Sequence, residues 1–325
     1  MLNRRQFTAA GLAALAATPA RAQTWPDRPI RILAGYPAGG GIDLVARLFA
    51  EQMKTAFNQT VIVENRPGAS AMIASNAVAK AAPDGLTLLM AASGEVAINQ
   101  HIHKDRMTYD PARELSPVAL VGIVPCVVVV AAATPVKDGR ELIAYARANK
   151  GKLSFSSSGI GNPQQLAGEL MNHMAGTDVL HVPYRGGGAL VPDLLSGSIT
   201  GAMTEVSTAL PHLGGKVRIL AVASAKRAPK APDSPTMIEQ GVKDFTAASY
   251  VGILAPTGTP AEVVKALEAA LIKALNDKGT QEKFLATGAE LVPDELMTSK
   301  GFGDYIRREY ELAREAAKLA GLTPA

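Results

Sequence analysis

The chain has 325 residues with 33 basic and 29 acidic side chains, and only seven tyrosines, seven phenylalanines and one tryptophan. Three arginines and no acids fall in residues 1–22, so the rest is almost neutral, and no stripe of basic and aromatic residues is present; both features argue against nucleic-acid binding. With 47% apolar residues the chain can build two cores, and its single cysteine, Cys126, cannot form an internal disulfide. Its apolar neighbours Val127–Val130 predict a buried structural thiol.

The first 22 residues predict an export signal. Arg4 and Arg5 precede a weakly apolar stretch at 7–17, and Ala20-Arg21-Ala22 is a small-x-small cleavage pattern, so we expect the mature chain to begin at Gln23 in the periplasm. The arginine pair resembles a twin-arginine signal, and a Sec signal with two incidental arginines is the alternative. A permanent membrane anchor needs about 20 strongly apolar residues, which this stretch lacks.

Short β-rich runs alternate with amphipathic helices along the remaining chain, which predicts layered α/β architecture. The run 118–133 is strongly apolar but contains Pro125, and we interpret it as buried strand rather than a membrane span. The expected strands cover 29–34, 61–64, 87–90, 118–133, 153–156, 180–182, 219–223 and 249–254. The expected helices cover 42–57, 72–81, 142–148, 164–174, 189–195, 261–276 and 302–320.

Two glycine- or serine-rich turns each join a strand to a helix. The first is 35–41, before the helix at Ile42, and the second is 156–163, before the helix at Gln164. A helix N-terminus has unpaired N–H groups and a partial positive charge, and glycine allows an anion to approach closely. Asn162 is a good N-cap and Pro163 suits the first helical position. Either turn alone is a common connection, but one in each domain could hold a carboxylate from both sides.

Other chemistries do not match the sequence. It has no phosphate-binding loop of the Gly-x-x-x-x-Gly-Lys type and no Gly-x-Ser-x-Gly nucleophile turn, and Gln164 stands where a dinucleotide-binding loop after Gly159 and Gly161 needs glycine. His101 and His103 form the only close histidine pair, without further ligands to complete a metal site. We therefore expect no cofactor, no metal and no catalytic activity.

Three polar positions near these turns have two interpretations each. Asp43 could contact a ligand, but we favour a role in bracing the first turn and complementing the helix dipole. Arg185 could pair with a ligand carboxylate or could be a solvated surface residue. Thr204 and Glu205, after a β-like segment, are candidate ligand-binding residues, and an exposed strand end is the alternative.

The ordered set of motifs resembles the Bug-type, TctC-like solute receptors of tripartite tricarboxylate transporters over nearly the whole mature chain. The motifs are Trp25-Pro26-x-Arg28-Pro29-Ile30-Arg31, Tyr36-x-x-Gly39-Gly40-x-x-Asp43, Val63-Glu64-Asn65-Arg66-Pro67-Gly68-Ala69, Ala79-Lys80-Ala81-x-Pro83-Asp84-Gly85, Tyr109-Asp110-Pro111, Leu166-Ala167-Gly168-Glu169, His181-Val182-Pro183-Tyr184-Arg185-Gly186, Ala209-Leu210-Pro211-His212 and Leu254-Ala255-Pro256-x-Gly258-Thr259-Pro260.

The resemblance implies a type-II periplasmic binding protein fold, with domain 1 at 23–124 plus 249–325 and domain 2 at 125–248. It implies a monomer that binds a small organic carboxylate, largely through backbone N–H groups and water, and delivers it to the membrane components of such a transporter. An accessory protein for a membrane sensor kinase has the same sequence requirements, and a periplasmic enzyme on this fold would need a nucleophile–base pair that we do not find. The implied ligand-binding residues are Tyr36, Ala38, Gly39 and Gly40 with Asp43 behind them, then Ser156, Ser158, Gly159, Gly161 and Asn162, with Ser93 and Tyr184 lining the cleft.

Three departures from the family pattern concern the ligand. Asn162 stands where Ser or Thr is usual, Gln165 stands where His is common, and Thr204-Glu205 replaces Asp-Asn. A carboxylate at 205 on the cleft floor would repel a second ligand carboxylate. We therefore expect the far end of the ligand to be neutral, cationic or aromatic.

Overall fold

The computed structural model describes residues 25–243 and 245–322. The expected export signal and the cleavage site near Ala22 lie outside the described residues. Among the described helices, none is both long and apolar enough to cross a membrane.

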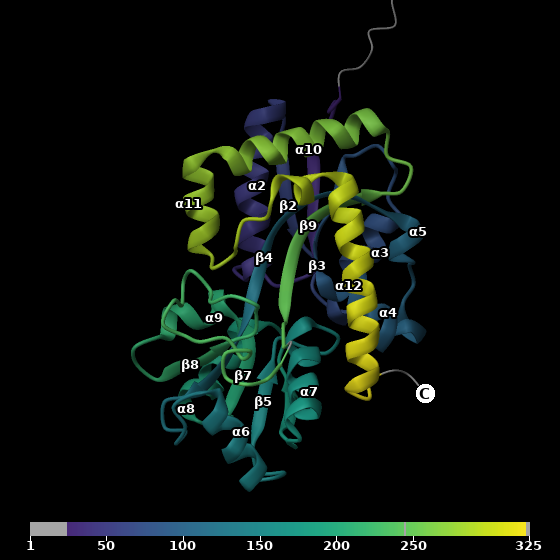
Figure 1. Ribbon diagram of the computed structural model, residues 1–325. Coiled ribbons are helices and arrows are strands. Elements are labelled where there is room, and N and C mark those ends of the chain that lie inside the picture. The colour runs from purple at the N-terminus through teal and green to yellow at the C-terminus, as the bar shows by residue number, and fades with distance from the viewer. Residues whose placement is uncertain (1–24, 244, 323–325) are drawn as a thin grey trace, which may run out of the picture.

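The upper half of the molecule in Figure 1 is built on parallel strands. β1 (Ile30–Ala34) lies between β2 (Val61–Asn65) and β3 (Thr87–Ala92), with Ile32 opposite both Val63 and Leu88. The side chains of Ile30 and Ile32 point to the same face of β1, and both are fully buried, as expected for a parallel sheet whose faces are covered. The helices of this half are α2 (Gly41–Phe57), α3 (Met72–Ala79), α4 (Asn99–Ile102), α5 (Pro111–Glu114), α10 (Ala261–Asn276), α11 (Lys278–Ala286) and α12 (Ser299–Leu319).

The lower half has its own strands and helices. β5 (Ser154–Ser157) pairs in parallel with β6 (Leu180–Pro183) and with β7 (Gly201–Glu205). β8 (Val217–Val222) follows β7 in the sequence. Its helices are α6 (Gly139–Ala148), α7 (Pro163–Ala175), α8 (Gly187–Ser196) and the short α9 (Val206–Ala209). Single turns of other helix types occur at Ala69–Ala71, Gly94–Ile98, Lys104–Arg106, Leu210–His212 and Asp294–Met297.

Two long antiparallel strands, β4 (Leu115–Ala131) and β9 (Ala248–Pro256), connect the halves (Figure 1). β4 pairs with β9 as far as Pro125, opposite Ala248, and from Cys126 onward it pairs with β7 and β8. Pro125 thus lies where β4 changes partners, a position at which its missing N–H interrupts no continuous ladder. The domain boundaries inferred from the resemblance fall beside this change, and the division itself stays a prediction.

Several sequence-based elements need correction. The strand expected at 118–133 begins at Leu115, passes through Pro125 and ends at Ala131. The helix expected at 72–81 ends at Ala79, and α11 was not predicted at all. Cys126 is fully buried as expected, and burial raises the pKa of its thiol.

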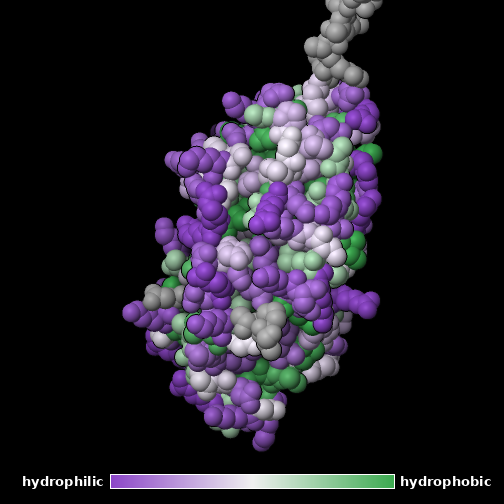
Figure 2. All heavy atoms as spheres, turned by 90° about the vertical axis from the view of Figure 1, so that its right-hand side faces the viewer, coloured by the Kyte–Doolittle hydropathy of each residue, from purple (hydrophilic) through white to green (hydrophobic). Residues whose placement is uncertain are grey.

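Figure 2 shows the face that includes the right-hand side of Figure 1, where α12 lies. Hydrophilic residues dominate this face, and hydrophobic ones occur in small groups. The end of α12 also packs on the lower half, because Ala313 and Ala317 cluster with Leu166 of α7.

Candidate ligand-binding cleft

A cavity of about 370 Å³ lies between the two halves, and both predicted turns line it. This volume is sufficient for a small organic acid with a few waters. The lining from the first turn is Tyr36 to Ile42, and that from the second is Ser158 and Asn162 to Gln164. Further lining residues are Leu44, Ala92, Arg185 to Ala189, Val191, Glu205, Ser207, Thr208, Pro211, His212 and Ser249.

Asp43 braces the first turn from behind. Its carboxylate accepts hydrogen bonds from Gly39 N (2.8 Å), Asn65 Nδ2 (2.9 Å) and Arg47 Nε (2.9 Å), and its residue is only 2% exposed. Burial alone would raise the pKa of Asp43, but these hydrogen bonds lower it overall. The favoured interpretation of Asp43 as a brace agrees with this geometry.

A second buried carboxyl holds the other end of the same turn. Glu95 accepts hydrogen bonds from the Tyr36 hydroxyl (2.9 Å) and from Ala92 N (2.8 Å), and its own carbonyl accepts one from the Tyr109 hydroxyl (2.6 Å). Burial raises the pKa of Glu95 to about 7, even though these partners oppose the shift. Sequence analysis missed Glu95 because 59 residues separate it from Tyr36.

The second turn is organised by its N-cap. Asn162 Oδ1 accepts from Gln165 N at 2.8 Å, and Asn162 Nδ2 donates to Ser158 Oγ at 3.1 Å. Gln165 returns a bond through its Oε1, which accepts from Gly161 N at 2.8 Å. Asn162 therefore caps the helix through Gln165 N, and Gln165 in turn fixes the residue before the cap, Gly161. The predicted N-cap at Asn162 and Pro163 at the first helical position are confirmed.

A third helix start, that of α8, lines the same cavity and was not predicted as part of the site. Gly186 is its N-cap, with φ of 100°, and Gly187 and Gly188 begin the helix. A Cβ at Gly187 would lie 2.6 Å from Thr208 Oγ1, so only glycine permits this approach. The run Arg185–Gly188 before an expected helix shows the same pattern as the two predicted turns and could have indicated it.

The three helix starts all leave first-turn N–H groups outside the intrahelical ladder. In α2 the first backbone hydrogen bond of the helix runs from Leu44 N to Gly40 O, and in α7 it runs from Leu166 N to Asn162 O. In α8 the first turn is closed by the bond from Ala189 N to Gly186 O. The N–H groups of Gly41 and Ile42, of Gln164, and of Gly187 and Gly188 precede these bonds. Such groups attract an anion, and here three sets surround one cavity.

Glu205 is a carboxyl in the wall of this cavity, at the end of β7. Its Oε1 accepts from Gln164 Nε2 at 3.3 Å, and a Cβ at Gly41 would lie 3.3 Å from its Oε2. Burial raises the pKa of Glu205 to about 6. Thr204 is 2% exposed, so the interpretation of this pair as an exposed strand end is wrong for Thr204, and Glu205 is partly exposed, to the cavity.

The predicted site residues do not all line this cavity. Tyr36, Ala38, Gly39, Gly40, Ser158, Asn162 and Glu205 do, and so does Arg185. Gly159, Gly161 and Tyr184 instead line an adjoining cavity of about 580 Å³, which shares Tyr36, Ser158 and Asn162 with the first. Four predicted residues line neither cavity: Asp43, Ser93, Ser156 and Thr204.

Contacts across the gap bring the halves together beside the second cavity. Ser70 Oγ in the upper half donates to the carbonyl of Ile160 in the lower half at 2.5 Å. Within the upper half, Asn99 Nδ2 donates to the carbonyl of Ser70 at 3.0 Å. A Cβ at Gly161 would lie 2.3 Å from Asn99 Oδ1, so the second turn approaches the upper half at glycine. Within the lower half, the Tyr184 hydroxyl donates to Asp193 Oδ2 at 2.5 Å.

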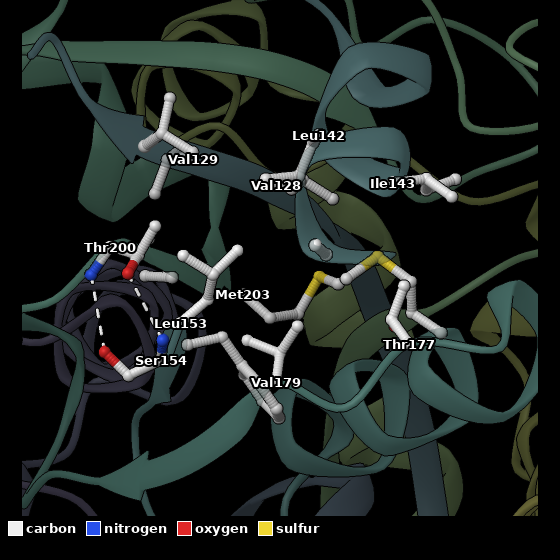
Figure 3. Close-up of a pocket in the computed structure, with 16 residues that line it drawn as sticks. Val128, Val129, Leu142, Ile143, Leu153, Ser154, Thr177, Val179, Thr200 and Met203 are labelled. Atoms are coloured by element: carbon white, nitrogen blue, oxygen red, sulfur yellow. Dashed lines mark hydrogen bonds between the residues drawn. The ribbon is translucent and has the colours of Figure 1, made fainter. Parts of the chain in front are cut away.

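A third cavity, within the lower half, is a packing void. Figure 3 shows Val128, Leu142, Val179 and Met203 around it, and its volume is about 30 Å³, close to that of one water. Ser154 and Thr200, drawn in the same view, bond to each other through backbone N–H and hydroxyl groups at 3.2 and 3.4 Å. Over the described residues, no group of three His, Cys, Asp or Glu side chains is placed to hold a metal ion.

Comparison with known proteins places this geometry in one family. The model for the tripartite tricarboxylate transporter family receptor matches residues 45–315. The chain is 34% identical over 307 residues to Protein BugT of Bordetella pertussis, covering 93% of this chain and 94% of that one. It is also 37% identical over 279 residues to a protein from the tcbD-tcbE intergenic region of Pseudomonas sp. (strain P51), covering 84% of this chain and 82% of that one.

Solved structures give the same result. An R. palustris protein solved with adipate has a TM-score of 0.87 at 31% identity, covering 93% of this chain and 100% of its own. The periplasmic binding protein BugD has a TM-score of 0.84 at 32% identity, covering 92% and 99%. MatC from Rhodopseudomonas palustris with bound malate has a TM-score of 0.84 at 28% identity, covering 90% and 99%. The expected fold, that of a periplasmic binding protein, is confirmed.

Proposed function

The chain belongs to the family of tripartite tricarboxylate transporter receptors, and we propose that it captures a small organic carboxylate in the periplasm and delivers it to a transporter of that type. The observation that carries this proposal is the convergence of the α2, α7 and α8 N-terminal turns on one cavity of about 370 Å³. Relatives solved with adipate and malate support a carboxylate as the ligand class.

The capture step follows from the position of the turns. The first belongs to the upper half, and the second and third belong to the lower half, so a bound carboxylate would contact both. A ligand that binds better when the halves are together favours closure by that difference in affinity. Carboxylates held in this way would bind at about micromolar strength, equivalent to about 8 kcal/mol. No covalent step is needed.

A thermal-shift screen tests the capture step. Residues 23–325 would be heated with a panel of mono- and dicarboxylates and with matched amides. A ligand at a hundredfold its dissociation constant adds about 2.7 kcal/mol to the free energy of unfolding, which raises the midpoint by several degrees. A panel in which carboxylates stabilise the protein no better than their amides would contradict the proposal.

The delivery step needs a separate test. Ligand-loaded protein should retain the membrane components of a tripartite tricarboxylate-type transporter from solubilised membranes, and ligand-free protein should retain less. Retention of a sensor kinase in their place would favour the sensing alternative.

A further inference from the structure

The inference concerns Glu205 and rests on the proposed function. Its carboxyl stands at the end of β7 and at the N-cap position of α9, and it faces the cavity that the three helix starts surround. It approaches Gly41, the first residue of α2, so closely that a Cβ there would lie 3.3 Å from Glu205 Oε2. Anything bound at the α2 turn therefore lies close to this carboxyl.

No cation neutralises Glu205 within the part of the chain that the structure describes. The two groups that stabilise its charge, Gln164 and Ser207, are neutral. Arg185 and His212 line the same cavity, but no ion pair joins either of them to Glu205. By contrast, Asp43, behind the same turn, has Arg47 as its ion-pair partner at 2.9 Å. Glu205 is thus a partly desolvated carboxyl with free acceptor capacity toward the cavity.

The chemistry of the cavity is consequently asymmetric. The helix starts supply N–H donors, which suit one carboxylate, and Glu205 supplies an acceptor, which suits a donor. A second ligand carboxylate near Glu205 would bring two like charges together in a site where water screens them poorly. An ammonium or hydroxyl group there would satisfy the acceptor instead, and its hydrogen bond to Glu205 would offset the cost of removing both groups from water.

We propose that Glu205 is a specificity-determining residue that selects monocarboxylates carrying a hydrogen-bond donor, an ammonium above all, over dicarboxylates of equal length. The ligand carboxylate lies at the helix starts and its donor contacts Glu205.

Matched ligand pairs provide the test. Succinate is compared with γ-aminobutyrate, and adipate with ε-aminocaproate, because each pair differs only at one end. Titration calorimetry at about pH 8 keeps Glu205, whose pKa is about 6, ionised. The wild-type protein should bind the amino acid of at least one pair about tenfold or more tightly than the diacid, and Glu205→Gln should bring that ratio to within about threefold.

Glu169→Gln is the matched control. Glu169 is a half-buried glutamate of α7 whose pKa is also raised by burial, but it lies outside the residues that line the cavity. This variant should leave the wild-type ratio unchanged, and thermal unfolding of all three proteins shows whether each is folded.

Two binding patterns, and a complete absence of binding, would each overturn the inference. One is tighter binding of the diacid in both pairs by the wild-type protein; the other is a preference for the amino acid that Glu205→Gln does not alter. Binding of none of the four compounds would also refute this ligand class. The proposed receptor function would fail only if the full carboxylate panel failed as well.

Discussion

Asp43 and Glu95 fix the first binding turn through different bonds. Asp43 accepts from the backbone of Gly39, inside the turn, whereas Glu95 accepts from the hydroxyl of Tyr36, at its start. Asn65 joins the two ends, since its amide donates both to Asp43 Oδ1 and to the carbonyl of Tyr36. These bonds hold the turn in place before a ligand arrives, which reduces the entropy lost on binding.

Removing the Asp43 brace should weaken both carboxylate binding and stability. Asp43→Ala deletes the acceptor for Gly39 N, and we expect it to cost about 2 kcal/mol of unfolding free energy and about tenfold or more in carboxylate affinity. Denaturant unfolding and titration calorimetry measure the two effects. Asp105→Ala, at an exposed aspartate, is the control. Unchanged affinity in Asp43→Ala would show that the turn needs no brace.

Glu95 makes stability depend on pH in a direction that can be stated. Its pKa rises from the usual 4.5 to about 7 in the folded protein, so the folded state binds the proton more tightly than the unfolded state. The resulting stabilisation is complete below pH 4.5 and is lost as the pH rises through 7. Glu95→Gln keeps an acceptor for Ala92 N and removes the titration.

Relative to wild type, we expect Glu95→Gln to gain about 2–3 kcal/mol in unfolding free energy between about pH 5 and pH 8. Urea denaturation across this range measures the difference. Parallel pH profiles of the two proteins would exclude Glu95 as the titrating group.

At the residue scale, sequence analysis could predict contacts made within a few positions. Asn162 and Gln165 are three residues apart, and Gly39 and Asp43 four, so the capping and bracing roles could be read from spacing. Glu95 and Gly187 could not, because each acts on a partner brought close only by the tertiary fold.

At the element scale, local patterns indicated most strands and helices, but not their ends or their partners. The strand expected at 118–133 includes Pro125, but its sequence does not show that β4 changes neighbours there. A single extended residue, Asp277, separates α10 from the unpredicted helix α11 and is the N-cap of α11. A break of one residue is too short for periodicity to distinguish the two helices. Strand partners depend on contacts across the whole chain, which periodicity does not contain.

The start of α7 offers an element-scale prediction. Asn162→Ala removes the cap on Gln165 N and the bond to Ser158, and should cost about 1 kcal/mol of unfolding free energy and reduce carboxylate affinity. Asn162→Ser should recover most of both, because serine is also a good N-cap. Equal carboxylate affinity in Asn162→Ala and in the wild-type protein would show that the cap does not contribute to binding.

At the scale of the whole molecule, one nine-stranded sheet, in which β4 and β9 connect the two halves, places three helix starts around one cavity. The ordered motifs predicted this family and the first two turns. The adjoining cavity and the bond from Ser70 to Ile160 arise from how the halves meet, which no segment of the sequence specifies alone.

The most direct measurement is an NMR titration of isotope-labelled protein, residues 23–325, with the most stabilising carboxylate of the panel. The backbone amide resonances report which N–H groups the ligand contacts. The account predicts large shifts at Gly41, Ile42, Gln164, Gly187 and Gly188 and small ones around the void at Val128 and Met203. Saturable binding that leaves the amides of all three helix starts unchanged would contradict it.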